Sequence, residues 1–250
     1  LRYDSVNQDF TSPVTGVTTN EYNEALTPRI GIVYQPIEPI SLYASYSQSF
    51  NPNRGTDAQG RPFDPETGQG FEVGIRAELL EGRLATTLAY FDITKQNVLT
   101  PDPVAVPFAF IATGEQRSRG VDLNITGEIL PGWNVVASYA YIDAQVTEST
   151  TNTLGNRFSG IPEHSASLWT TYEIQSGDLE GLGFGLGLNY VGERQGDIAN
   201  SFRLDSYFIA NAAAFYRRDN WQFRLNVDNL FDTDYIEAAN GARFRLVQPG

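Results

Sequence analysis

The sequence contains no cysteine and no methionine, and its single histidine is His164. A chain without cysteine has no disulfide, no thiol nucleophile and no thiolate metal ligand. Positive charge is also scarce: 17 Lys+Arg stand against 30 Asp+Glu, which gives a formal net charge of −13. Because nucleic-acid phosphates would repel so acidic a chain, we expect no nucleic-acid partner. No apolar run reaches the roughly 20 residues that a membrane-spanning helix needs.

In place of long apolar runs, the sequence contains segments in which apolar and polar residues alternate. From Val121 to Ile129, the odd positions are apolar or glycine and the even positions are polar. This period of two places one face of a β-strand against an apolar medium and the other against water. Pro131-Gly132 predicts a tight reversal, and the alternation resumes at Trp133. Strands of soluble domains usually have about five or six residues, whereas strands of about ten residues cross a membrane at a tilt.

The connections between such segments alternate between short turns and long polar loops. An up-and-down membrane barrel has this asymmetry, with tight turns at one rim and loops at the other. We therefore predict an all-β fold, an antiparallel up-and-down transmembrane β-barrel, of which this chain supplies about eleven to twelve strands; a soluble β-sandwich is the alternative. Residues 1–7 are predicted to end a strand, and a polar loop is predicted to follow up to about Leu26. The short turns are predicted at 36–39, 81–82, 131–132, 176–180 and 218–220.

Six stretches, taken in order, resemble the C-terminal half of the barrel of TonB-dependent siderophore receptors of the ferrichrome-receptor type. The resemblance implies a barrel of about 22 strands whose lumen holds an N-terminal plug. It also implies that residues 1–250 are the C-terminal part of the receptor barrel domain, with the plug domain and the first half of the barrel absent. The matching stretches are SLYASYSQSF (41–50), FEVGIR (71–76), GEQRSRGVDL (114–123), PGWNVVASYAYIDA (131–144), PEHSASLWTTYE (162–173) and LNVDNLFDTDY (225–235).

The resemblance implies a function as well as a fold. It implies a receptor in the bacterial outer membrane that imports a ferric siderophore by TonB-dependent active transport, and not an enzyme. The partners would be the ferric siderophore, outer-membrane lipid and the TonB energy-coupling complex, the last through the missing N-terminal region. The siderophore would be a transported ligand, with no cofactor and no resident metal. The alternatives are a passive porin, which would lack a plug, and a β-rich adhesin or lectin, whose outward rows would be interrupted by charges.

Two groups of inward-facing residues are candidates for binding. Glu72 and Asp122 occupy polar positions of alternating strands, and the resemblance implies that acids at these two positions contact arginines of the plug. Four further residues are inward by parity, and the resemblance implies that aromatic and polar groups high in the lumen meet the chelate. Each of the four could instead simply line the wall. They are Ser47, Ser49, Gln116 and Trp169.

Two other features suggest chemistry but are better explained by structure. His164 and Ser165 are adjacent, as a nucleophile and its base could be, but no third group that would orient them is recognisable, so we predict no catalytic residues. Glycines at 181, 183, 185 and 187 have the spacing of one strand face rather than of a phosphate loop. We expect them to leave that face of the wall bare.

Overall fold

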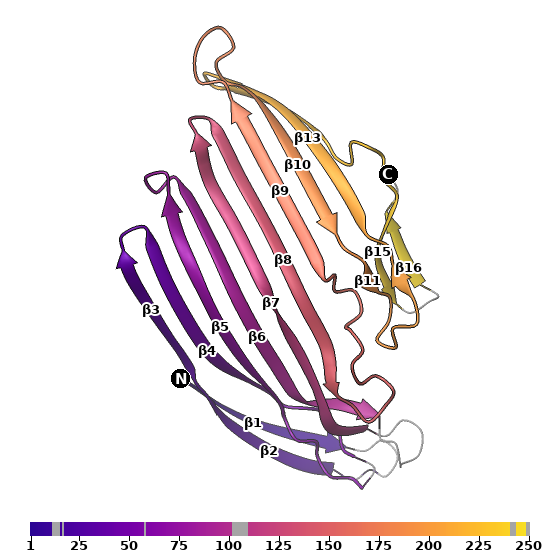
Figure 1. Cartoon of the computed structure of the whole chain (residues 1–250). Helices are drawn as coiled ribbons and strands as arrows, with labels where there is room; N and C mark the ends of the chain where they lie inside the picture. Colours follow the sequence, from indigo (N-terminus) through magenta and orange to yellow (C-terminus); the bar gives the residue numbers. More distant parts are fainter. Residues whose placement is uncertain (12–15, 17, 58, 102–109, 241–243, 249–250) are drawn as a thin grey trace.

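The computed structural model describes residues 1–250 except 12–15, 17, 58, 102–109, 241–243 and 249–250. Ten antiparallel strands pair in sequence order and form one bowed sheet (Figure 1), which confirms the up-and-down antiparallel prediction. None of the described residues forms a helix suited to spanning a membrane. The ten strands are β3 (Arg29–Ile37), β4 (Ile40–Asn51), β5 (Glu66–Leu79), β6 (Leu84–Pro101), β7 (Phe110–Leu130), β8 (Trp133–Glu148), β9 (His164–Glu173), β10 (Leu182–Val191), β13 (Tyr207–Arg218) and β14 (Trp221–Val227).

Three two-stranded sheets lie outside the main sheet. They are β1 (Arg2–Thr11) with β2 (Thr18–Thr27), β11 (Arg194–Gln195) with β12 (Arg203–Leu204), and β15 (Tyr235–Asn240) with β16 (Phe244–Gln248). The predicted loop up to Leu26 is therefore wrong, because most of it is a hairpin. Polar side chains hold this hairpin, as when the Tyr3 hydroxyl donates to Glu24 at 2.8 Å. Both of its faces carry polar residues, so the alternation test does not detect it.

The predicted number of strands agrees with this arrangement. β2 and β3 are separated only by Pro28, which has no N–H to donate to a sheet. β1 pairs with β2, and β16 pairs with β15, which follows β14. If β2 is counted with β3 and β15 with β14, and the two-residue strands β11 and β12 are left out, the described residues form twelve strands.

The longest strands exceed the predicted ten residues. β6, β7 and β8 have 18, 21 and 16 residues. Toward the loops, charged pairs replace the apolar residues on one face: Arg117 with Asp92, and Arg119 with Asp143 at 3.1 Å. Hydrogen bonding continues where the apolar pattern ends, so the strands extend beyond the segment that alternation can identify.

The short connections end the strands at one rim of the sheet, as predicted. The reversal between β7 and β8 requires a glycine at Gly132, whose φ of 80° lies in the left-handed region. A side chain there would also clash with the carbonyl oxygen of Glu173. Trp133 follows this turn at once, and its Nε1 donates to the Thr170 hydroxyl at 2.8 Å.

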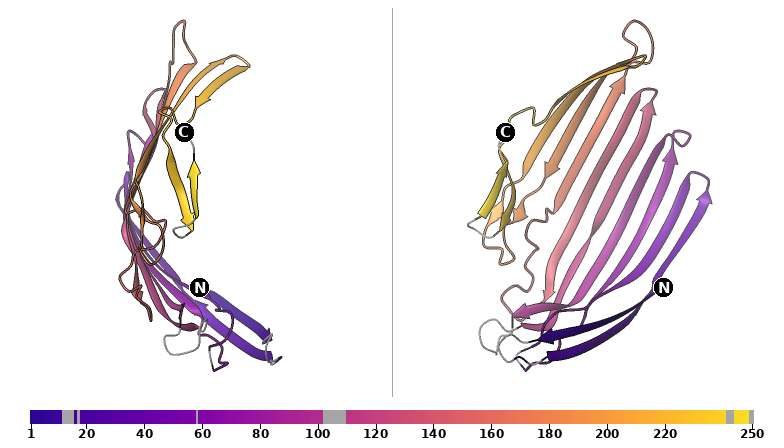
Figure 2. Two further views of the ribbon diagram at one scale, coloured as in Figure 1. Left: turned by 90° about the vertical axis from the view of Figure 1, so that its right-hand side faces the viewer. Right: turned by 180° about the vertical axis from the view of Figure 1, so that it is seen from behind.

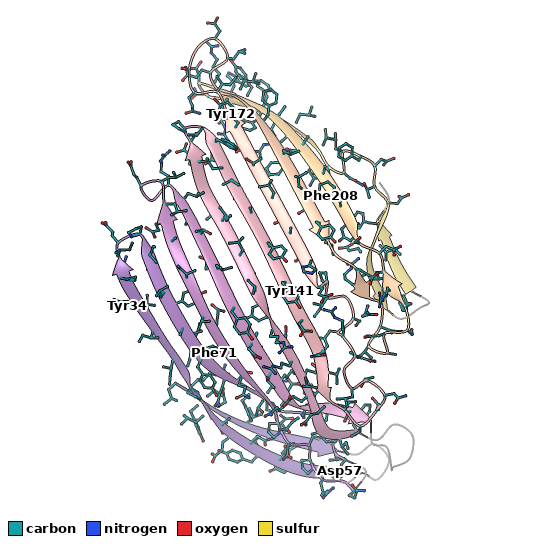
Figure 3. All side chains as sticks on the ribbon, viewed as in Figure 1. Tyr34, Asp57, Phe71, Tyr141, Tyr172 and Phe208 are labelled. Carbon is teal, nitrogen blue, oxygen red and sulfur yellow. The ribbon has the colours of Figure 1, made fainter. Side chains whose placement is uncertain are left out.

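One face of the sheet carries an unbroken apolar row. Residues directly opposite one another in neighbouring antiparallel strands point to the same face. The row that contains Leu123 crosses nine strands and contains no polar or charged residue other than tyrosine: Tyr34, Leu42, Ile75, Leu88, Leu123, Tyr139, Ala166, Tyr190 and Phe208. Tyr34, Phe71, Tyr141, Tyr172 and Phe208, which Figure 3 labels, belong to this face on five different strands.

The opposite face, which carries Asp122, is the concave one. Asp122 lies in one cross-strand row with Ala140, Ser165, Val191 and Tyr207, so Asp122 and Tyr207 share a face. The Tyr207 ring contacts the Tyr235 ring of β15 at 4.4 Å between centroids. Figure 2 shows the β15–β16 hairpin on the concave side of the bowed sheet. The predicted inward parity of Asp122 is thus confirmed.

Candidate functional site on the concave face

The two predicted acids lie around one tyrosine. Tyr43 of β4 pairs with Gly74 of β5, which pairs with Ala89 of β6, which pairs with Asp122 of β7. Glu72 lies two residues before Gly74 and so points to the same face. One cross-strand row therefore brings Glu72 and Asp122 to the same part of the concave wall, with Tyr43 beside both.

The Tyr43 ring lies across the wall because its neighbours are small. A Cβ atom on Gly74 would lie 2.5 Å from ring carbons of Tyr43, so the ring occupies the space above this glycine. Ala89, the next residue in the row, is only 8% exposed although it lies on an open sheet face. Gly74 and Ala89 thus form a shallow trough that directs the tyrosine hydroxyl toward the acids.

Each acid is held by a neighbour, and neither has a counter-charge. The Tyr43 hydroxyl lies beside the Glu72 carboxylate and within the electrostatic reach of Asp122. The Asn124 amide donates to the Asp122 carboxylate from the same strand and face. The described part of the chain contains ten ion pairs. Neither Glu72 nor Asp122 belongs to any of them. The pair therefore offers partly exposed negative charge to the concave side.

A second group of predicted residues meets nearer the loops. Ser49, Gly68, Lys95 and Gln116 are successive members of one cross-strand row. The Ser49 hydroxyl leans over Gly68, where a side chain would collide with it. Ser47 lies two residues below on the same face. The structure therefore places Ser47 and Ser49 of β4 and Gln116 of β7 on one polar surface, with β5 and β6 between them.

Trp169 does not join this polar surface. Its ring lies over Gly185 and Gly187 of β10, at 3.0 and 2.8 Å from the positions that their Cβ atoms would take. The Phe215 ring covers Gly183 in the same way, and it is only 5% exposed. The expectation that these glycines leave the wall bare is wrong, because rings from the two neighbouring strands fill the space.

Several residues of this face were not anticipated from the sequence. Lys95 lies in the row between Ser49 and Gln116 and forms an ion pair with Glu66 at 2.9 Å. Tyr43 was recognisable only as an inward residue. Lys95 occupies an inward position of its own alternating strand, as Ser47 does of its strand. The same alternation could therefore have identified the lysine from the sequence. The direction of the Tyr43 ring depends on Gly74 and Ala89 from two other strands, which no local pattern reveals.

His164 has a structural role. Its Nδ1 lies 2.9 Å from the Tyr139 hydroxyl, and its ring is 5.1 Å from that of Tyr141. These are neighbours on the convex face, and no hydrogen bond joins His164 to Ser165 in the described residues. Among the described residues, no three His, Cys, Asp or Glu side chains cluster so that they could hold a metal ion.

Comparisons with known proteins agree with this architecture. Residues 1–230 match the model of the family described as "TonB dependent receptor-like, beta-barrel". The metal-pseudopaline receptor of Pseudomonas aeruginosa is 41% identical over 245 residues, which cover 95% of this chain and 34% of the relative. The ferrichrome outer membrane transporter/phage receptor of Escherichia coli K12 is 35% identical over 240 residues, which cover 94% of this chain and 32% of the relative.

A solved structure shows the same backbone arrangement. The siderophore receptor PiuA from Acinetobacter baumannii superimposes with a TM-score of 0.85 at 28% identity, over 99% of this chain and 38% of that one. This chain spans about a third of the length of the curated relatives that it matches.

Proposed function

The chain belongs to the TonB-dependent receptor-like β-barrel family, and on that basis we propose that it serves in the import of a ferric siderophore by TonB-dependent active transport. The family consists of transport receptors, not enzymes, in the outer membrane of Gram-negative bacteria. The apolar rows of the convex face suit contact with membrane lipid. The observation that carries the proposal is the family match over residues 1–230, together with relatives named for siderophores.

Active transport through so wide a barrel needs a plug that closes the lumen. We assign residues 1–250 to the C-terminal part of the barrel domain and expect the plug and the remaining strands elsewhere in the whole protein. Energy coupling to TonB would act through that plug. The uncompensated carboxylates of Glu72 and Asp122 support a role in plug contact, because an acid facing another surface is stabilised there only by a cationic partner.

The ligand would be met nearer the loops. Ser47, Ser49 and Gln116 present hydroxyl and amide groups on one surface, and the neighbouring Lys95 adds a cation whose charge Glu66 partly balances. Such a surface is suited to the oxygen-rich exterior of a metal chelate. We keep Trp169 as a candidate for stacking against the ligand from the same face.

A second candidate function differs only in the cargo. The relative that is 41% identical is named for a metal–pseudopaline complex, a name that does not specify iron. The cargo of this receptor would then be a chelate of another metal, bound on the same surface.

Binding by the whole receptor distinguishes these cargoes. We would titrate the purified full-length protein with one siderophore loaded in turn with Fe³⁺, Zn²⁺ or Ni²⁺, and with pseudopaline loaded in the same way, following intrinsic tryptophan fluorescence. Saturable binding of an Fe³⁺ siderophore supports the first proposal. Binding confined to a pseudopaline complex supports the second, and no saturable binding of any chelate contradicts both.

A further inference from the structure

A small pocket lies at the loop ends of β6, β7 and β8, beside the polar surface of Ser47, Ser49 and Gln116. Its volume is about 230 Å³. Sites that enclose a whole drug-sized ligand measure about 300–1,000 Å³, whereas an apolar cavity of about 150 Å³ takes up a benzene molecule. This pocket therefore has room for one substituent of roughly six carbons, and not for an entire chelate.

Gln116 joins the pocket to the polar surface. It pairs with Lys95 of β6 on one side and with Val146 of β8 on the other, so the row of polar residues continues into Val146. Gln116 and Val146 both line the pocket, and Val146 is only 6% exposed. A ligand that rests on the polar surface therefore lies next to the pocket, on the same face of the sheet.

Hydrocarbon groups from strands and loops line the pocket. Val98 pairs with Gly114, which lies two residues before Gln116 and so faces the same side. A Cβ atom on Gly114 would be 2.7 Å from the methyl carbon of Thr100, so this methyl group lies against bare backbone. Ile198, from the segment between β11 and β12, adds an aliphatic side chain. These groups suit an apolar occupant, because removing apolar surface from water is favourable.

The hydroxyl groups in the wall are already bonded to one another. Ser149 Oγ lies 3.0 Å from Thr151 Oγ1 and 2.8 Å from Thr153 Oγ1, and the two threonine oxygens are 2.9 Å apart. Three hydroxyls have only three O–H donors, and these three hydrogen bonds use all of them. A hydrocarbon group that enters the pocket therefore leaves none of these donors without a partner.

The charges at the pocket are negative. Glu115 and Glu148 line it, and the described lining residues include no lysine or arginine. Both carboxylate oxygens of Glu115 accept hydrogen bonds, from Gln96 at 2.9 Å and from Thr147 at 2.7 Å, and Glu148 is exposed to solvent. An acidic substituent would be repelled by these carboxylates. The two acids therefore disfavour an anionic group without requiring a cationic one.

We propose that this pocket binds an uncharged apolar substituent of the imported chelate, such as an acyl chain or a ring of roughly six carbons. The metal-bearing part of the chelate would lie on the polar surface, and Gln116 would contact both parts. The inference rests on the proposed function and adds a class of substrate to it, namely chelates that carry a hydrocarbon side group. It assigns Val146 and Ile198 as residues that set specificity.

Chelates that differ only in this substituent test the site. We would prepare two ferric cores, a trihydroxamate and a tricatecholate, each with one side amine acylated by an acetyl or by a hexanoyl group. Isothermal titration calorimetry of the full-length receptor gives the affinity for each form. The hexanoyl form adds four methylenes, and each buried methylene is worth about fourfold in affinity. On whichever core binds, we expect the hexanoyl form to bind at least fivefold more tightly than the acetyl form.

Ile198→Asn is the decisive variant, because Ile198 is 43% exposed and its replacement should not impair folding. The preference for the hexanoyl form should shrink at least threefold, while the affinity for the acetyl form stays the same. Leu154→Asn is the matched control. Leu154 is a 63% exposed aliphatic residue of the β8–β9 connection and is not among the described residues that line the pocket, so this variant should keep the full preference.

Two results overturn the inference and leave the proposed function intact. One is a pair of wild-type affinities, for the acetyl and hexanoyl forms of a core that binds, within fivefold of each other. The other is a hexanoyl preference in Ile198→Asn that shrinks less than threefold. If no form of either core binds, the proposed import of ferric siderophores is contradicted together with the inference.

Discussion

The Tyr43 ring lies directly over Gly74, so close that a Cβ atom on the glycine would come within 2.5 Å of it. Four residues away on the same strand and face, Gly70 has room to spare: a Cβ atom there would be 3.5 Å from the Ser47 hydroxyl oxygen and 3.7 Å from Ile93. Gly70 and Gly74 thus lie on the same strand and face, but an aromatic ring covers only Gly74. The effect of this difference on the stability of the barrel can be measured.

Gly74→Ala should destabilise the barrel, because the Tyr43 ring must leave its trough; overpacking of this kind costs about 1–3 kcal/mol. Gly70→Ala should be neutral or slightly stabilising, since alanine is a better strand residue than glycine. The measurement is the temperature at which the folded band of the full-length receptor is lost in semi-native gel electrophoresis. Equal midpoints for the two variants would show that the ring does not occupy this position.

The acid pair beside Tyr43 gives a prediction about the closed pore. In the whole receptor, Glu72→Gln combined with Asp122→Asn should loosen the plug. Removing one partner of a buried ion pair costs about 3–5 kcal/mol of stability, because the other charge is left buried and unpaired. We expect larger and more frequent conductance steps in planar bilayers. Glu78→Gln is the control, since Glu78 pairs with Arg76 near the short turns. A double mutant as tight as the wild type rules out this role.

The polar surface near the loops gives a prediction about affinity. Gln116→Ala should weaken chelate binding about fivefold, the equivalent of one hydrogen bond of roughly 1 kcal/mol. Gln96→Ala is the matched control: Gln96 is adjacent to Lys95 in sequence, points to the other face, and donates to Glu115 at 2.9 Å. Titration of both purified variants with the same chelate decides the matter. Equal losses at the two positions would mean that the effect is not specific to the inner surface.

How far the sequence predicts this structure depends on the medium that each face meets. The strand that contains Val121 to Ile129 was predictable because lipid and water impose opposite requirements on its two faces. The β1–β2 hairpin was not, because both of its faces carry polar residues: Asn20 donates to Asn7 at 2.8 Å on one face, and Asn23 donates to Glu21 at 2.6 Å on the other. The inward parity of Glu72 and Asp122 was likewise readable from alternation.

Contacts across strands were beyond the reach of local patterns. The rings of Trp169 and Phe215 fill the space over the β10 glycines, and the pairing register decides which ring meets which glycine. The same holds for Arg194, whose carbonyl partners lie more than forty residues away. The sequence identifies such residues as inward or polar, but their partners follow only from the fold.

Acid should loosen the loop that leads into β9. The hydrogen bond from Arg157 lowers the pKa of Glu163 below its ordinary value of 4.5. The stabilisation from this pair is therefore complete above about pH 4.5 and is lost as the pH falls through the lowered pKa. Hydrogen-exchange protection of residues 149–163, corrected for intrinsic rates, should fall over that range. Glu163→Gln should remove this dependence, and an unchanged profile in that variant would assign it to another group.

The central claim is that this barrel belongs to an energised importer of ferric siderophores rather than to an open pore. Uptake of a siderophore labelled with radioactive iron, in cells that produce the full-length receptor with or without TonB, tests it most directly. The account predicts saturable accumulation that requires TonB and stops when the proton gradient is collapsed. Uptake that rises in proportion to concentration and is equal in the two strains would contradict it and identify a passive porin.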